Sequence, residues 1–268
     1  MIVDVVTYAG EYECLLLRLH ELAGVVDYHV LVEAMETFTG LPKPLHYEGR
    51  DRARLGALAS RVLSCVAVLP RSDDPWARET YQRNMALRLL DARPADTVVL
   101  VGDVDEIPSA EAVTLAEAMI DEGNPQLAFQ QRLCLYYANN RCTTAPNWYG
   151  TQAVRLDWLR RVTPQGVRNV RNNAPYITNA GWHFGSLLGD EGAPRFARKL
   201  ASFSHAQEVA QYTSAEHIAE AIAAGADVSG RTDILFSADL EPKEEDYPVW
   251  LWANRREYSH LFAPGSKL

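Results

Sequence analysis

The stretch TVVLVGDVDEIP, residues 97–108, decides how this chain is interpreted. Residues 97–101 form a continuous apolar and β-branched run, which is typical of a strand covered on both faces. One glycine later the chain carries three carboxylates, at Asp103, Asp105 and Glu106. Because ligands of open α/β sheets bind beyond the carboxyl ends of the strands, this stretch predicts a buried strand with a binding site at its end.

In the first half of the chain, short apolar runs alternate with amphipathic stretches, which indicates an α/β protein with a mostly parallel sheet, and the second half is less regular. We expect further strands at residues 2–7, 28–33, 62–69, 127–135, 151–156 and 176–182. We expect helices at residues 11–22, 50–59, 76–90, 194–202 and 214–224. No repeat or linker interrupts the pattern, so we predict one domain over residues 1–264. The last four residues, GSKL, resemble a vector scar and are left out of this prediction.

Composition narrows the possible partners. The chain has 268 residues, 47% hydrophobic and 23% charged, which is ordinary for a globular protein that carries no membrane span. Its formal net charge of −9 argues against a nucleic-acid partner, since phosphate contacts need a basic surface. The chain begins with a strand-like run and nowhere holds about 18 consecutive apolar residues. We therefore expect a cytoplasmic protein with no signal peptide and no transmembrane segment.

The four cysteines show neither CxxC spacing nor histidines at zinc-finger distances. We expect buried thiols in a reducing compartment. Cys134 and Cys142 are close enough in sequence to pair across a hairpin, and the sequence does not decide whether they do.

The acidic residues suggest a metal site. Asp103 and Asp105 are two residues apart, so in extended chain their side chains are expected to point to the same side. A divalent cation removes the repulsion between two such carboxylates, and carboxylate oxygens suit Mg²⁺ or Mn²⁺. These ions keep waters and bind substrate phosphates, which predicts a diphosphate ligand. The alternative is a polar loop before a helix that Ser109 caps.

Several segments then carry a resemblance to a known family. They are TFTGLPKPL at residues 37–45, QRN at 82–84, DVDEIP at 103–108, GWH at 181–183 and KLASFSH at 199–205. In this order and spacing they resemble glycosyltransferase family 17, which contains the β-1,4-mannosyl-glycoprotein 4-β-N-acetylglucosaminyltransferases and many bacterial relatives. The matches run from about residue 5 to about residue 230.

The resemblance implies a nucleotide-diphosphate-sugar transferase fold of the GT-A type, with a nucleotide-binding half at about 1–108 and an acceptor half at about 109–264. It also implies an inverting transfer, helped by Mn²⁺ or Mg²⁺, from a UDP-sugar to a glycan or another hydroxyl acceptor. UDP-N-acetylglucosamine is the donor that the family suggests. Relatives carry Asn-Glu where this chain has AGEYE at residues 9–13, and whether Glu11 or Glu13 takes that role stays open.

Roles for the acidic residues follow from the residues and the resemblance together. Asp105, with Asp103 acting through water, is expected to place the metal on the donor diphosphate. Glu106 is the expected general base, since it adjoins the metal pair and the family keeps it. His183 is the expected additional metal ligand, and a histidine with a purely structural role is the alternative.

Further residues are expected to bind the donor. Glu33 ends a predicted strand and is expected to hold a ribose hydroxyl or the uracil edge. Arg83 and Asn84 lie in the QRN motif, although Arg83 is also spaced to form a surface pair with Glu79. Lys199 and His205 are expected to stabilise the departing nucleoside diphosphate.

Two other classes of protein remain open at this point. A phosphohydrolase can also use an Asp-Val-Asp strand end with magnesium. A non-catalytic carbohydrate-binding module can use an aromatic-rich stretch such as Tyr136, Tyr137, Trp148 and Tyr149. The first predicts phosphate release without an acceptor, and the second predicts glycan binding without affinity for a nucleotide.

Overall fold

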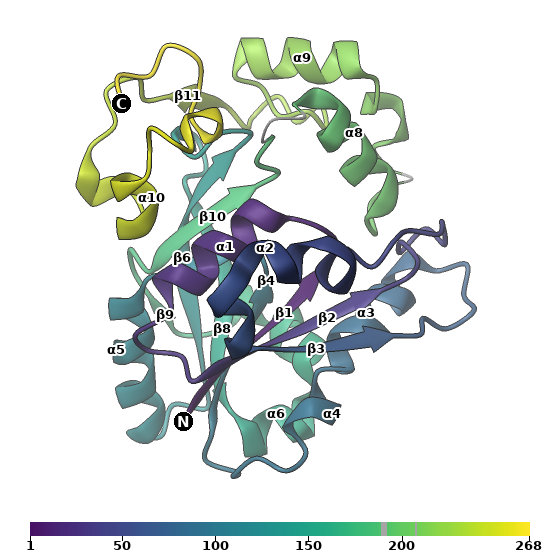
Figure 1. The fold of residues 1–268 in the computed structure, drawn as a ribbon, viewed down its shortest axis with the longest axis vertical. Helices are drawn as coiled ribbons and strands as arrows, with labels where there is room; N and C mark the ends of the chain where they lie inside the picture. Colours follow the sequence, from purple (N-terminus) through teal and green to yellow (C-terminus); the bar gives the residue numbers. More distant parts are fainter. Residues whose placement is uncertain (189–191, 207) are drawn as a thin grey trace.

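The computed structural model describes residues 1–188, 192–206 and 208–268. Its main feature is one mixed sheet whose strands follow the order β11-β7-β6-β8-β4-β1-β2-β3 (Figure 1). These strands are β1 (Ile2–Tyr8), β2 (Tyr28–Ala34), β3 (Val62–Ala67), β4 (Val98–Asp103), β6 (Gln126–Leu135), β7 (Asn140–Cys142), β8 (Asn147–Arg155) and β11 (Phe236–Ala238). Three short strands join beside this path: β5 (Glu106–Pro108), β9 (Tyr176–Ile177) and β10 (Gly181–Gly185).

The sheet has a parallel half and an antiparallel half. β3, β2, β1 and β4 are parallel neighbours, whereas β4–β8, β8–β6, β6–β7 and β7–β11 pair antiparallel. A parallel pair needs a crossover long enough for a helix, and the first hundred residues supply such helices. A short connection links β6 to β7, as antiparallel pairing allows, and β8 pairs antiparallel with β6 on its other side. The predicted α/β class and Rossmann-like parallel arrangement are confirmed in the first half.

The helices lie on both faces of the sheet. Their bounds are α1 (Tyr12–Glu21), α2 (Arg52–Leu55), α3 (Pro75–Asn84), α4 (Leu87–Leu90), α5 (Ala110–Asp121), α6 (Leu156–Val162), α7 (Pro164–Asn169), α8 (Ala193–Ser202), α9 (Ala215–Ala224) and α10 (Val249–Ala253). Side chains cap α3 and α5: Trp76 N donates to Asp74 Oδ1 at 2.9 Å, and Ala112 N donates to Ser109 Oγ at 3.3 Å, as expected for Ser109. Successive side chains of a strand point to opposite faces of the sheet. In β1, Val6 therefore packs with α1, whereas Val5 packs with the apolar residues of α4, α6 and α7.

A small helical unit sits at the end of the molecule remote from the N-terminus (Figure 1). It contains α8 and α9, and it has an apolar cluster of its own that includes Phe196, Leu200 and Ile218. α8 connects this unit to the carboxyl edge of the parallel strands through side chains described below.

The C-terminal residues return to the sheet. Ser266 Oγ accepts a hydrogen bond from Asn139 Nδ2 at 2.8 Å, and Lys267 N donates to Leu240 O at 2.9 Å. The last four residues, which the sequence interpretation set aside, therefore pack against the domain.

Two expectations about the whole chain can be compared with the structure. All four cysteines lie within the described residues and are free thiols, so Cys134 and Cys142 are not joined. Among the helices of residues 1–188, 192–206 and 208–268, none combines the length and the apolarity of a membrane span.

Candidate active site

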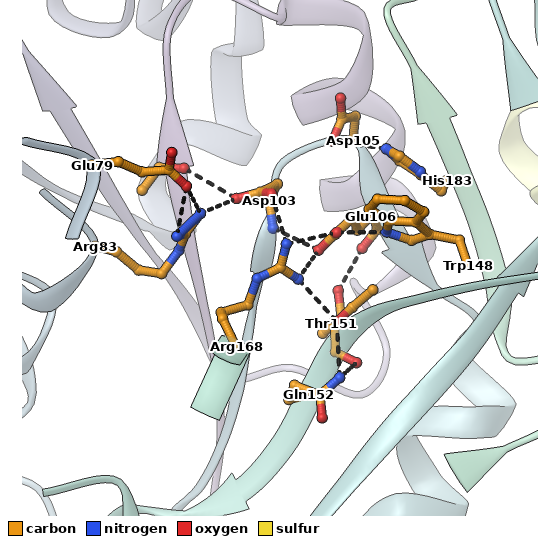
Figure 2. Close-up of polar contacts among 12 residues, drawn as sticks. Glu79, Arg83, Asp103, Asp105, Glu106, Trp148, Thr151, Gln152, Arg168 and His183 are labelled. Atoms are coloured by element: carbon orange, nitrogen blue, oxygen red, sulfur yellow. Dashed lines mark hydrogen bonds and ion pairs between the residues drawn. The ribbon is translucent and has the colours of Figure 1, made fainter. Parts of the chain in front are cut away.

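The acidic stretch turns sharply instead of continuing as a strand. β4 ends at Asp103, residues 104 and 105 form a turn, and β5 begins at Glu106 and pairs antiparallel with β10. The expectation that Asp103 and Asp105 point to the same side was wrong, because it assumed extended chain through Val104. The two side chains contact different partners, as Figure 2 shows.

Asp103 lies between two arginines. Its Oδ1 accepts from Arg83 Nη2 at 2.6 Å and its Oδ2 accepts from Arg168 Nη2 at 2.8 Å (Figure 2). Burial raises the pKa of Asp103, but the charges of Arg168 and Arg83 outweigh this and hold the pKa well below its usual range. Arg83 is also held by Glu79 at 3.0 Å. With both oxygens occupied by guanidinium groups, Asp103 does not fit the predicted role of metal ligand.

Glu106 lies at the centre of the same network and is 0% exposed. It accepts two hydrogen bonds from Arg168, at 2.5 and 2.8 Å, one from Trp148 Nε1 at 2.8 Å, and one from Asp103 N at 2.9 Å. Both carboxylate oxygens are used, and none of this residue's surface reaches solvent. The predicted role of general base therefore does not fit this geometry, and Glu106 instead holds the turn and Arg168 in place.

Asp105 faces the α8 side of the site. Its Oδ2 accepts from Lys199 Nζ at 3.0 Å, and its Oδ1 lies 3.6 Å from His183 Nε2. Burial raises the pKa of Asp105, yet the charges of Lys199 and His183 outweigh it and lower the pKa overall. Burial dominates at His183, where it lowers the pKa and favours the neutral imidazole at pH 7. The structure thus brings together three of the predicted site residues: Asp105, His183 and Lys199.

The Asp105–His183 pair is the part of this site that fits a divalent cation. A neutral imidazole and a carboxylate are both suitable ligands, and the His183 nitrogen near Asp105, Nε2, lies 3.6 Å from Asp105 Oδ1. Within the described residues no group of three or more His, Cys, Asp or Glu side chains is arranged around a common point. Substrate phosphates and water would have to complete the shell, as Mg²⁺ and Mn²⁺ commonly require.

The other predicted donor-binding residues are placed differently. Glu33 is 2% exposed and accepts from Lys43 Nζ at 3.0 Å, His46 N at 2.8 Å and Tyr47 N at 3.0 Å. These bonds fix the chain after β2, so the expected contact of Glu33 with a ribose or a base does not fit. Asn84 Oδ1 accepts from Gln165 N at 3.0 Å and connects α3 to α7, away from Asp105's partners.

The remaining residues named from the sequence, His205, Glu11 and Glu13, form no hydrogen bond or ion pair with Asp105 or Lys199 within the described part of the chain. His205 is half-exposed, pairs with Glu208 at 2.9 Å, and meets the Trp76 ring edge-on with centroids 4.6 Å apart. Glu13 pairs with Arg195 of α8 at 2.7 Å, whereas Glu11 accepts from the backbone of Ala9 at 2.9 Å.

The sequence interpretation missed Arg168, and it named Trp148 only as part of an aromatic-rich stretch. Arg168 comes from α7, a six-residue helix that had no periodic signal, and it is 4% exposed. The ring of Trp148 is 4.6 Å from the ring of His183, and the Arg171 guanidinium lies over it at 4.9 Å. Trp148 therefore contacts both the His183 ring and the Glu106 carboxylate, and the Arg171 guanidinium covers its ring.

Glycine is required where β10 pairs with β5. Gly181 has φ +124°, and a Cβ there would lie 2.2 Å from Ile107 O and 2.8 Å from Pro108 Cα. We expect Gly181→Ala to be much more destabilising than Gly123→Ala, because Gly123 has a similar φ of +107° but open space around it. The difference should reach about 1–3 kcal/mol, the cost of overpacking. Urea unfolding of both variants measures it, and equal losses would show that β10 can move away freely.

A pocket of about 280 Å³ opens between the loops that follow β2 and β3. It is lined by Phe38, Thr39, Ser72, Asp73, Pro75 and Arg78. The end of α8 borders it, since Phe38 N donates to Ser202 O at 3.2 Å and Thr39 Oγ1 donates to Ala201 O at 3.2 Å. The pocket and Asp105 therefore lie along the same carboxyl edge of the parallel strands, which is where ligands of such sheets bind.

Comparison with known proteins adds a family match. The model of Glycosyltransferase family 17 matches residues 1–237. The β-1,4-mannosyl-glycoprotein 4-β-N-acetylglucosaminyltransferases of Homo sapiens and Rattus norvegicus are each 27% identical to this chain over 208 residues. These matches cover 70% of this chain but 38% of each relative, so the matched region is about two fifths of those proteins.

Solved structures give only distant likenesses. A 4-diphosphocytidyl-2C-methyl-D-erythritol synthase from Anaerococcus prevotii is 11% identical, with a TM-score of 0.40, and the match covers 66% of this chain and 86% of that one. The galactosyltransferase LgtC, solved with donor and acceptor sugar analogues, is 12% identical, with a TM-score of 0.35, and the match covers 64% and 66% of the two chains. Likenesses this weak carry no information about chemistry.

Proposed function

The chain belongs to glycosyltransferase family 17, and we propose that it transfers a sugar from a nucleoside-diphosphate donor to a hydroxyl acceptor with the help of a divalent cation. The observation that carries this proposal is the meeting of Asp105, His183 and Lys199 at the carboxyl edge of β4. A carboxylate, a neutral imidazole and an ammonium group side by side suit a metal–diphosphate ligand better than they suit a neutral sugar.

The donor would lie along the carboxyl edge of the parallel strands. The pocket lined by Phe38 and Asp73 is the proposed place for the nucleoside. The Phe38 ring can stack on a base, and the Asp73 carboxylate can accept a hydrogen bond from an N–H of that base. The diphosphate would then reach Lys199. Burial lowers the pKa of Lys199, but the nearby Asp105 carboxylate raises this pKa more strongly. Lys199 is therefore cationic at neutral pH and suited to stabilise the charge that develops on the leaving group.

Asp105 and His183 are the residues that would hold Mn²⁺ or Mg²⁺. Such an ion, when bound, neutralises diphosphate charge as the glycosidic bond breaks. The protein's own contribution is to keep Asp105 ionised and His183 neutral, and to bring Lys199 from α8 to the same point. Asp103 and Glu106 support the turn that presents Asp105.

Family membership also supports the finer points of the proposal. We propose UDP-N-acetylglucosamine as the donor, a glycan or another glycoconjugate as the acceptor, and inversion at the anomeric carbon. The relatives' names state a mannosyl-glycoprotein acceptor for those enzymes. For this chain, the anomeric proton coupling of the product in NMR, compared with that of the donor, reports whether the configuration is inverted. The phosphohydrolase and the binding module lack support from the family match.

Titration calorimetry with UDP tests the central claim. We expect UDP to bind more tightly with Mn²⁺ present than with EDTA, by about tenfold or more, because Asp105 and His183 alone form an incomplete shell that the diphosphate completes. Lys199→Ala should weaken UDP binding. Lys243→Ala is the control and should leave UDP binding unchanged, because Lys243 is an exposed residue outside the proposed site. Identical UDP affinities with Mn²⁺ and with EDTA would contradict a metal-bridged donor.

A further inference from the structure

A buried ion pair lies directly behind the turn that carries Asp105. Arg18 of α1 and Asp4 of β1 are both 0% exposed. Arg18 Nε and Nη2 donate to the two Asp4 oxygens at 2.7 and 2.6 Å, and His29 Nδ1 lies 2.8 Å from Asp4 Oδ2. The surrounding face of the sheet is apolar and packs against α1.

The third nitrogen of this guanidinium is directed at the turn. Arg18 Nη1 donates to Asp103 O at 3.1 Å and to Glu106 O at 2.5 Å. These two carbonyls bracket Val104 and Asp105, so one side chain holds both ends of the segment from which the Asp105 carboxylate projects. Asp4 holds the other edge of the guanidinium, which fixes its plane.

Fold stability alone is a weak reason for this arrangement. Taking two charges out of water costs several kcal/mol per ion, and apolar side chains of similar volume are often as stabilising as a buried pair. What apolar side chains cannot supply is a fork of donors with fixed geometry, and a lysine supplies only a point charge on a flexible stem. The feature that needs an arginine here is the pair of turn carbonyls.

We propose that Arg18 is a positioning residue for the transfer reaction: held by Asp4, it fixes the turn at 103–106 so that Asp105 meets His183 and Lys199. It touches neither the donor nor the reacting atoms, and its charge is compensated by Asp4. Its effect is therefore geometric, and displacement of a site group by about 1 Å can cost about a hundredfold in rate. This inference rests on the proposed function.

Two variants test it. Arg18→Lys keeps the charge beside Asp4 but removes the fork, and the double variant Asp4→Leu/Arg18→Met replaces the ion pair with apolar side chains. We expect both to fold, with the double variant more stable than Arg18→Met alone, because it leaves no uncompensated charge at Asp4. Both should nevertheless lose at least about tenfold in UDP affinity with Mn²⁺ and in donor turnover.

Arg61→Lys is the matched control. Arg61 also donates through its guanidinium to backbone carbonyls, those of Ala23, Val26 and Asp27, but these lie between α1 and β2 at the opposite edge of the sheet. We expect a loss of Tm without a loss of UDP affinity measured well below Tm.

The outcomes separate the two claims. Absence of Mn²⁺-dependent UDP binding by the wild type overturns the proposed function, and this inference with it. Wild-type affinity and turnover in the Arg18 variants overturn only the positioning role. Failure of both variants to fold also overturns it, because Arg18 would then serve the fold alone.

Discussion

Asp105→Asn is expected to lower donor turnover by about a hundredfold to a thousandfold, the range seen when one group that stabilises developing charge is removed. The substitution keeps the shape of the side chain but removes the charge that Lys199 and His183 face. A neutral amide neither compensates Lys199 nor binds a hard cation as a carboxylate does. UDP release in the presence of Mn²⁺, from the UDP-sugar that the wild type uses fastest, is the measurement.

The fold should survive this change, because Asp105 lies in a turn and its neighbour Lys199 remains partly accessible to solvent. Asp227→Asn is the matched control: Asp227 is also buried and paired with an arginine, Arg231, but it lies in the loop after α9. We expect normal turnover from it. Full activity of Asp105→Asn, with an unchanged Tm, would refute the assignment of the site.

Arg168→Met is expected to destabilise the protein by about 3–5 kcal/mol, since it leaves a buried carboxylate without its counter-charge. Glu106 takes two hydrogen bonds from Arg168 and has no exposed surface, so water cannot replace the lost partner. Asp103 loses one of its two arginines in the same step. The free energy of unfolding in urea measures the loss.

A double variant tests whether the uncompensated charge of Glu106 causes this loss of stability. Adding Glu106→Gln to Arg168→Met removes the uncompensated charge, so the double variant should be less destabilised than the sum of the single variants. Arg160→Met is the control: Arg160 donates to the carbonyls of Leu90, Asp91 and Arg93 on an exposed surface, and its loss should cost about 1 kcal/mol. A loss below that value for Arg168→Met would mean that the network is not coupled to folding.

Much of the fold could be predicted because it depends on local patterns. The β-branched run at 97–101 is a strand in any environment that covers both its faces, and Asp74-Pro75 and Ser109 begin helices through their own side chains. The second half was harder to predict, since α6 and α7 are short and β7 and β11 have three residues each. Such elements form because neighbours from elsewhere in the chain pair with them.

For the site, the sequence by itself determined that carboxylates lie at the end of β4, and the family resemblance added His183 and Lys199. Only the tertiary structure decided what each carboxylate does. A turn at residues 104 and 105 directs Asp103 and Asp105 to different partners, and Arg168, 62 positions after Glu106, occupies both oxygens of that glutamate. Local sequence sets backbone direction and chemical type, whereas the charge state and availability of a carboxylate depend on cations that folding brings from distant segments.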